Sequence, residues 1–302
     1  MTRFQKLAVA TTTVTFLLIG LGGFVRAAGA GLGCPDWPKC FGRWIPPTEA
    51  SQLPADIDPE LFNFQLAWIE YVNRLVGVTV GLLILGTAWL AWRDHRGDGP
   101  VLVPALAAVP LVAFQGWFGG QVVAHELDPR FVTVHLLVAV AIIAVLIAAA
   151  ANSFPKPGRG ETADRTRQFR LVRAGLVLVL LQICLGALVR GSIDLAAERF
   201  PDLDRGALLA EAGWLDGAHR TLGLAVLACC AALALVAARA SSHTPVWRRL
   251  GTAPLAVAAV QFAAGAGLAW FALPPALQVV HVLFASLLFG SLFLLSLRLR
   301  PG

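Results

Sequence analysis

Eight long apolar segments divide this chain of 302 residues. A bilayer with a hydrocarbon core of about 30 Å is crossed by roughly 20 apolar residues in a helix. Hydrophobic residues make up 57% of the chain and charged residues only 14%, whereas soluble domains carry about 25% charged residues. The sequence therefore predicts an all-α integral membrane protein with eight transmembrane helices. The expected spans lie at about residues 7–25, 66–92, 101–123, 130–152, 169–190, 214–238, 251–272 and 276–298.

The basic residues predict the orientation in the membrane. The formal charge of +6 comes from Lys and Arg clusters between apolar segments, which is typical of a multi-pass membrane protein and not of a nucleic-acid partner. Segments on one side hold fifteen Lys and Arg, and those on the other side hold seven. Because cytoplasmic loops carry the excess, we expect both termini in the cytoplasm and long outer loops at 27–65 and 191–213.

The chain matches itself at an offset of 146 residues, and this predicts an internal repeat. The matched pairs are Glu70 and Asp216, Asn73 and His219, Arg74 and Arg220, Gly77 and Gly223, Gln115 and Gln261, Gly119 and Gly265, and His135 and His281. Arg26 and Arg190 have similar neighbours at an offset of 164. Four spans per unit preserve the orientation, so we expect two pseudo-symmetric four-helix bundles as parallel repeats. Their expected bounds are 1–152 and 169–302, with a cytoplasmic linker at 153–168.

Ionisable residues inside the spans are candidates for function, because burying charge in lipid is costly. His219 and His281 fall on the sixth and eighth spans at similar depth, and His135 repeats the second of them. Two facing imidazoles across a bundle are the arrangement of bis-histidine haem ligation. The alternatives are hydrogen bonds between helices for the histidines, and a proton path through Glu70 and Asp216.

Four arginines are candidate partners of haem propionates. Arg74 and Arg220 either bind propionates or neutralise the acidic residue four positions earlier on the same helix face. Arg26 and Arg190, at the outer ends of helices, either bind propionates or extend toward the membrane surface.

Two cysteines lie in an expected outer loop. Cys34 and Cys40 are separated by a short Pro-rich spacer on the oxidising side of the membrane, where disulfides form. A structural disulfide and a redox-active pair both remain open.

With these features in view, the sequence resembles the haem A synthase family over nearly its whole length. The resemblance rests on Gly22-Gly23-Phe24-Val25-Arg26, Gly33-Cys34-Pro35-Asp36-Trp37-Pro38-Lys39-Cys40, Glu70-Tyr71-Val72-Asn73-Arg74, Val134-His135-Leu136, His219-Arg220 and Val280-His281. It implies an oxidoreductase of the cell membrane that oxidises the C8 methyl of haem O to a formyl group by successive hydroxylations, giving haem A for terminal oxidases. The reaction site is expected toward the outer face.

The resemblance also implies site residues and partners. His219 and His281 would bind haem b as an electron-transfer cofactor, the N-terminal half would take haem O, and Glu70 matches the catalytic acidic residue. Cys34 and Cys40 match the family's outer cysteine pair. The expected partners are the farnesyltransferase that makes haem O and an unidentified electron donor, since no Gly-rich nucleotide motif is present. The sequence does not decide the oligomeric state, and a homo-oligomer is one of the alternatives.

One position departs from the family pattern. Asn73 stands where the family often has a histidine, and a carboxamide is a poor iron ligand. We expect a substrate haem held by His135, with Asn73 and Arg74 beside it and an open or water-filled sixth position. A lost activity is the alternative for this position. Two rival functions remain for the whole chain: a catalytically silent haem b electron-transfer protein, and a proton-coupled transporter without haem.

Overall fold

The computed structural model describes residues 1–55, 57–155, 162–239 and 245–299. Within these ranges the chain forms helices and no strand, and eight helices are long and apolar enough to cross a membrane. The elements are α1 (Arg3–Ala27), η1 (Ala50–Gln52), η2 (Pro59–Leu61), α2 (Phe64–Asp94), α3 (Gly99–Ala124), α4 (Pro129–Asn152), α5 (Thr162–Arg199), α6 (Arg205–Ala210), α7 (Trp214–Arg239), α8 (Pro245–Trp270) and α9 (Pro275–Leu299). The predicted all-helical membrane fold is therefore confirmed.

Polar residues just before the helices fix where several of them begin. The side chain of Thr2 accepts a hydrogen bond from the backbone N–H of Gln5, and the Gln5 side chain accepts one from Thr2 in return. Asn63 caps α2, and Asp128 caps α4 by accepting from the N–H of Arg130 at 2.8 Å. These caps satisfy N–H groups that the first turn of a helix leaves without partners.

Helix α5 is longer than the apolar segment from which we predicted it. We expected a span at about 169–190 followed by a loop, whereas the helix continues to Arg199. The extension mixes charged residues with apolar ones, of which Ile193 and Ala196 pack in a small apolar cluster, so the continuous apolar segment ended before it. An ion pair at helical spacing, Arg190 to Asp194 at 2.9 Å, stabilises it.

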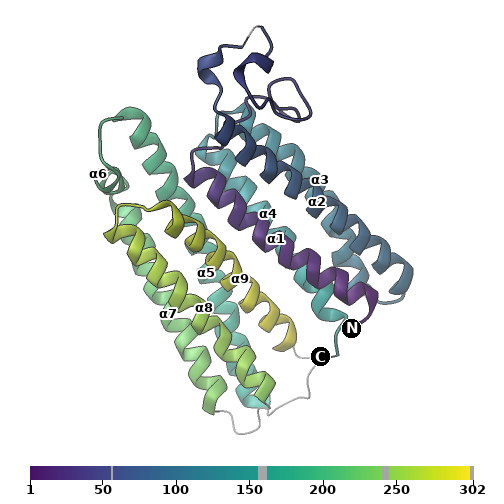
Figure 1. Cartoon of the computed structure of the whole chain (residues 1–302). Coiled ribbons are helices and arrows are strands. Elements are labelled where there is room, and N and C mark those ends of the chain that lie inside the picture. Colours follow the sequence, from purple (N-terminus) through teal and green to yellow (C-terminus); the bar gives the residue numbers. More distant parts are fainter. Residues whose placement is uncertain (56, 156–161, 240–244, 300–302) are drawn as a thin grey trace.

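The helices form two groups that lie side by side (Figure 1). Helices α1 to α4 pack together, as do α5, α7, α8 and α9, and α9 joins the groups by packing against α1 and α4. The 28–63 segment and α6 lie at one end of the molecule, here called the loop end, and the N-terminus and the last turns of α9 lie at the other, the terminal end. Of the expected linker 153–168, residues 156–161 lie outside the described residues, and α5 already begins at Thr162.

A continuous apolar core joins the two groups. Ile143 of α4, Val179 of α5, Leu233 of α7 and Leu292 of α9 are all buried members of one cluster. Outward-facing positions of the spans carry exposed apolar side chains, as expected for helices that contact lipid. This packing fixes the helices that carry the three candidate histidines.

Candidate functional site

His219 and His281 face each other between α7 and α9. Their ring centres are 6.2 Å apart, with the ring planes inclined by 63°. His219 lies five residues after the start of α7 and His281 six after the start of α9, so both sit roughly 8–9 Å below the loop end of their helices. The structure thus brings together the pair that we selected from the sequence.

The surroundings of this pair fit a metal ion held between two imidazoles. Imidazole nitrogens bind metal ions at about 2 Å, and the ring centre is roughly 1 Å further back, so two rings flanking one ion have centres about 6 Å apart. The Nδ1 atoms of both rings are buried and have no hydrogen-bond partner in the described part of the chain. A Cβ on Gly186 or on Gly265 would lie 3.0 Å from Cε1 of His219 or His281, respectively, so both rings occupy space that only glycine leaves.

Glutamines accompany the same two rings. The Nε2 of Gln182 donates to the backbone carbonyl of His219 at 2.9 Å and lies 3.3 Å from its Nε2, and the Nε2 of Gln261 lies 3.2 Å from the Nε2 of His281. Groups that bond a histidine ligand orient its ring. Gln182 and Gln261 are therefore candidate positioning residues.

The N-terminal half repeats part of this arrangement. His135 lies six residues after the start of α4, and a Cβ on Gly119 would lie 3.3 Å from its Cε1. Its Nδ1 is buried and has no hydrogen-bond partner among the described residues, and the same holds for Oδ1 of Asn73. Gln115 donates to the backbone carbonyl of His135 at 3.0 Å. One imidazole is thus set as in the C-terminal half, and the second ligand position holds a carboxamide.

The outer cysteine pair forms a disulfide that is packed onto α2. Cys34 and Cys40 are bonded, and both are buried. The backbone at Gly33 lies directly on the first turn of α2, because a Cβ there would lie 2.3 Å from the carbonyl oxygen of Leu66. Trp37, three residues after Cys34, lies against Gly120 of α3, where a Cβ would approach its ring to 2.9 Å. The loop therefore covers the loop end of the N-terminal helices.

Glu70 and Arg74 hold this loop in place. Oε2 of Glu70 accepts a hydrogen bond from the N–H of Cys34 at 2.7 Å, and its Oε1 pairs with the guanidinium of Arg74. Arg74 also donates to the carbonyls of Asp36 at 2.7 Å, Lys39 at 2.8 Å and Cys34 at 3.2 Å. Of the two uses we predicted for Arg74, the structure shows the neutralisation of Glu70, and it adds a third use in binding the loop.

The other arginines are also in ion pairs. Arg26 at the end of α1 and Arg190 on α5 both pair with Asp194, which ties the two groups of helices together at the loop end. Arg190 also donates to Oε1 of Gln278 at 3.1 Å. Arg220 pairs with Asp216 at 2.6 Å, and its side chain is 54% exposed. Arg220 is therefore the arginine among these that is most accessible to a further anion.

One titratable group outside the spans has a strongly shifted pKa. Asp128, the cap of α4, accepts hydrogen bonds from the side chain of Arg130 and from the backbone N–H of the same residue. These bonds, above all those from the side chain, lower the pKa of Asp128 from 3.8 to about 2. The carboxylate form is therefore the one that caps the helix bearing His135.

Sequence reasoning missed Gln182, Gly186 and Asp194. Gln182 has no match in the repeat, because its counterpart at the offset of 164 is Leu18. Asp194 follows Arg190 by four residues, which was a usable sign of an ion pair, but we read that segment as a loop. Gly186 could not be selected from the sequence, because its role depends on the His219 ring that packs against it in the structure.

Comparisons with known proteins give the family context. The profile of a family described as "Cytochrome oxidase assembly protein" matches residues 5–293. A protein of Shewanella oneidensis named "Heme A synthase" is 32% identical over 215 residues, covering 68% of this chain and 61% of its own length. The alignment with this relative thus spans less than two thirds of that protein.

Two further relatives align over more of their length. A "Heme A synthase" of Methylorubrum extorquens is 32% identical over 285 residues, covering 80% of this chain and 72% of the relative. One of Geobacillus thermodenitrificans is 26% identical over 313 residues, covering 99% of this chain and 93% of the relative. The similarity therefore extends across both groups of helices.

Proposed function

This chain belongs to the family of cytochrome oxidase assembly proteins, and we propose that it is a haem A synthase. In this reaction the C8 methyl group of haem O is oxidised to a formyl group by successive hydroxylations. The names of the relatives support the proposal, and one structural observation carries it: His219 and His281 face each other at the spacing of two imidazoles on one ion.

We propose that His219 and His281 hold haem b. When bound, this group supplies one-electron transfer. The part of the protein is to fix both rings, through Gly186 and Gly265 beneath them and through the glutamine contacts. Arg220 is the candidate for a propionate, and Arg26 and Arg190 remain candidates that would have to share their charge with Asp194.

Haem O is proposed to bind in the N-terminal half, with His135 as its single protein ligand. Gly22 is the counterpart of Gly186 at the offset of 164, and a Cβ there would meet nothing within 4 Å. The position opposite His135 is thus both roomier and without an imidazole. An arrangement of this kind suits a substrate that must leave after the reaction.

Glu70 and the outer loop are proposed to close the substrate site. Glu70 holds its negative charge against Arg74 and binds the N–H of Cys34, so it fixes the loop directly. A catalytic role of Glu70 requires it to reach the substrate, and we propose that it does so as the loop moves. Burial of the Cys34–Cys40 disulfide favours a structural role over a redox role.

The proposed setting is the cell membrane, with both termini in the cytoplasm and the reaction site toward the outer face. The excess of Lys and Arg near the terminal end supports this orientation. The farnesyltransferase that makes haem O and an electron donor are the proposed partners. The structure describes no cluster of three His, Cys, Asp or Glu that would hold another metal ion within its ranges.

Extraction of the bound haems tests the function. We would co-express the full chain with an enzyme that makes haem O, purify it, and identify acid-extracted haems by chromatography. Haem b with haem A or its hydroxylated precursors is expected. Haem b with only haem O would indicate a catalytically silent haem protein, and the absence of haem would leave the transporter.

Variants locate the two haems. His219→Ala and His281→Ala are each expected to lose the haem b spectrum while the protein still inserts. His135→Ala is the matched control, because it lies at the same depth in the other half, and it is expected to keep haem b. Equal loss of haem b in all three variants would refute the assignment.

A further inference from the structure

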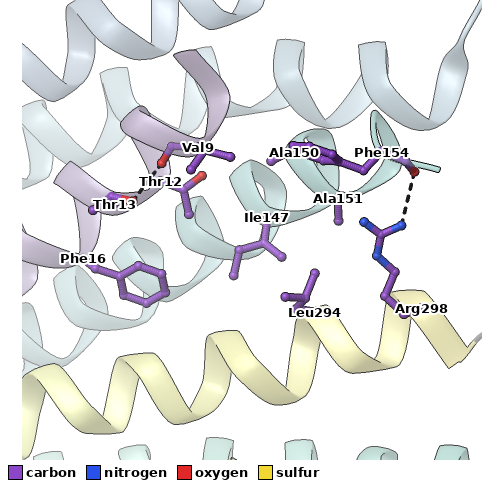
Figure 2. A pocket seen from close by; sticks show the side chains of 10 residues that line it. All are labelled: Val9, Thr12, Thr13, Phe16, Ile147, Ala150, Ala151, Phe154, Leu294 and Arg298. Carbon is purple, nitrogen blue, oxygen red and sulfur yellow. Dashed lines mark hydrogen bonds between the residues drawn. The ribbon is translucent and has the colours of Figure 1, made fainter. Parts of the chain in front are cut away.

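A cavity at the terminal end lies between α1, α4 and α9, remote from the histidines. Its volume is about 350 Å³, within the range of ligand cavities, and Figure 2 shows the side chains that line it. Phe16 and Arg298 stand at its opposite ends. His281 is thirteen residues, or about 20 Å, from Leu294 on the same helix, so this cavity is separate from the proposed haem sites.

The walls of the cavity are apolar. Ile147, Ala150 and Ala151 of α4 form a buried side. Thr12 and Thr13 line the cavity as well, but their hydroxyls donate to carbonyls of their own helix at 2.7 and 3.0 Å. With the hydroxyls satisfied in this way, the cavity offers a surface suited to hydrocarbon.

The cavity is closed toward the loop end and open on its flank. At Gly290 of α9 a Cβ would lie 2.6 Å from the ring of Phe16 and 3.2 Å from Ile147, so the helices meet there without a gap. Along α9 the cavity is lined by Leu294 and Arg298, four residues or about 6 Å apart, and along α1 its lining runs from Val9 to Phe16, seven residues or about 10 Å. Val9 on its rim is 39% exposed, so this flank of the cavity opens on the outer surface of α1, where lipid is expected in a membrane.

Arg298 places a positive charge where the cavity meets the membrane surface. Its Nη1 donates to the carbonyls of Phe154 and Pro155 at 3.2 and 3.3 Å, and a guanidinium carries three further N–H groups on Nη2 and Nε. Arg3 and Lys6, at the start of α1, add positive charge to the same end. A phosphate group is the anion that membranes present at this depth.

We propose that this cavity binds an anionic phospholipid, with one acyl chain between α1, α4 and α9 and the phosphate at Arg298. The lipid would enter from the leaflet at the terminal end, past Val9. It would fill the junction at which the N-terminal helices contact α9. This inference is independent of the proposed reaction.

Lipid retention tests the proposal. The purified full chain would be mixed with equal parts of phosphatidylglycerol and phosphatidylcholine in detergent, and the retained lipid measured by native mass spectrometry. Wild-type protein is expected to keep one phosphatidylglycerol in preference to phosphatidylcholine. Arg298→Gln is expected to lower that preference about fivefold, and Arg298→Lys to keep it. Arg96→Gln, a change of another basic residue at the terminal end, is the control and should leave the preference unchanged.

A second variant tests the acyl-chain part of the cavity. Ala151→Leu fills the space and is expected to abolish retention of either lipid. Arg298→Gln alters only the rim, so it decides the proposal if Ala151→Leu fails to fold. Equal retention of both lipids by the wild type, or a wild-type preference in Arg298→Gln, would overturn the proposal. Retention of a prenylated haem in place of a phospholipid would overturn the proposal as well.

Discussion

Replacing Gly186 with alanine tests whether the His219 ring is held in a haem-binding position. The new Cβ would lie 3.0 Å from Cε1 of His219, whereas carbon contacts are optimal at about 3.5–4.0 Å. The ring must therefore move by about 0.5 Å, which is the tolerance for a functional ligand. Overpacking of this kind destabilises the folded protein by about 1–3 kcal/mol, whereas replacing Gly with Ala in a helix stabilises it by about 0.5–1 kcal/mol. The net cost is roughly 0–2.5 kcal/mol.

The repeat supplies a matched control for this variant. Gly22→Ala makes the same chemical change at the equivalent position of α1, where a Cβ meets nothing within 4 Å. It is expected to stabilise the protein by about 0.5–1 kcal/mol and to leave haem b unchanged.

The assay is haem b per protein and its visible spectrum, together with thermal unfolding. If one to two kcal/mol of the strain falls on the haem-bound state, Gly186→Ala retains haem b about 5–30-fold more weakly. A wild-type haem content and spectrum in Gly186→Ala would refute the reasoning. An equal loss in Gly22→Ala would refute it too, since the effect would then not come from contact with the ring.

Three further predictions concern the N-terminal half. Glu70→Gln and Arg74→Gln should each let a small thiol reduce the buried outer-loop disulfide faster, because both residues bind the loop; unchanged reduction rates, measured by thiol labelling, would contradict this. Asn73→His should convert bound haem O from a high-spin to a low-spin spectrum and lower turnover, because a second imidazole then fits opposite His135; identical spectra would show that position 73 does not face the iron. Asp128 has a lowered pKa in the folded protein, so its carboxylate stabilises α4 above about pH 4, and this stabilisation is lost as the pH falls toward about 2. Asp128→Asn should remove this part of the acid sensitivity, which thermal unfolding between about pH 5 and pH 2 would measure.

Hydropathy and the repeat predicted much of this fold, because lipid imposes a simple requirement on each span. The end of α5 escaped prediction because its last turns mix charged with apolar residues and are stabilised by Asp194, which pairs with arginines from two helices. The hydrogen bonds from Arg74 to carbonyls of the loop could not be predicted from the sequence either. Backbone carbonyls are present at every residue, so no side-chain pattern marks the ones that a guanidinium will bind.

The two halves differ both at a ligand position and at the position of the glutamine that accompanies it. Where the C-terminal half has His219 with Gln182 beside it, the N-terminal half has Asn73, and Leu18 stands at the position that matches Gln182. Leu18 packs with apolar residues of the N-terminal core and cannot orient a ring by hydrogen bonding. A chance loss of the ligand alone would leave a glutamine with no ring to orient, whereas the ligand and its partner are absent together. This joint absence supports our proposal that the N-terminal half holds a haem from one side only, through His135, as expected of a substrate site and not of a permanent cofactor site.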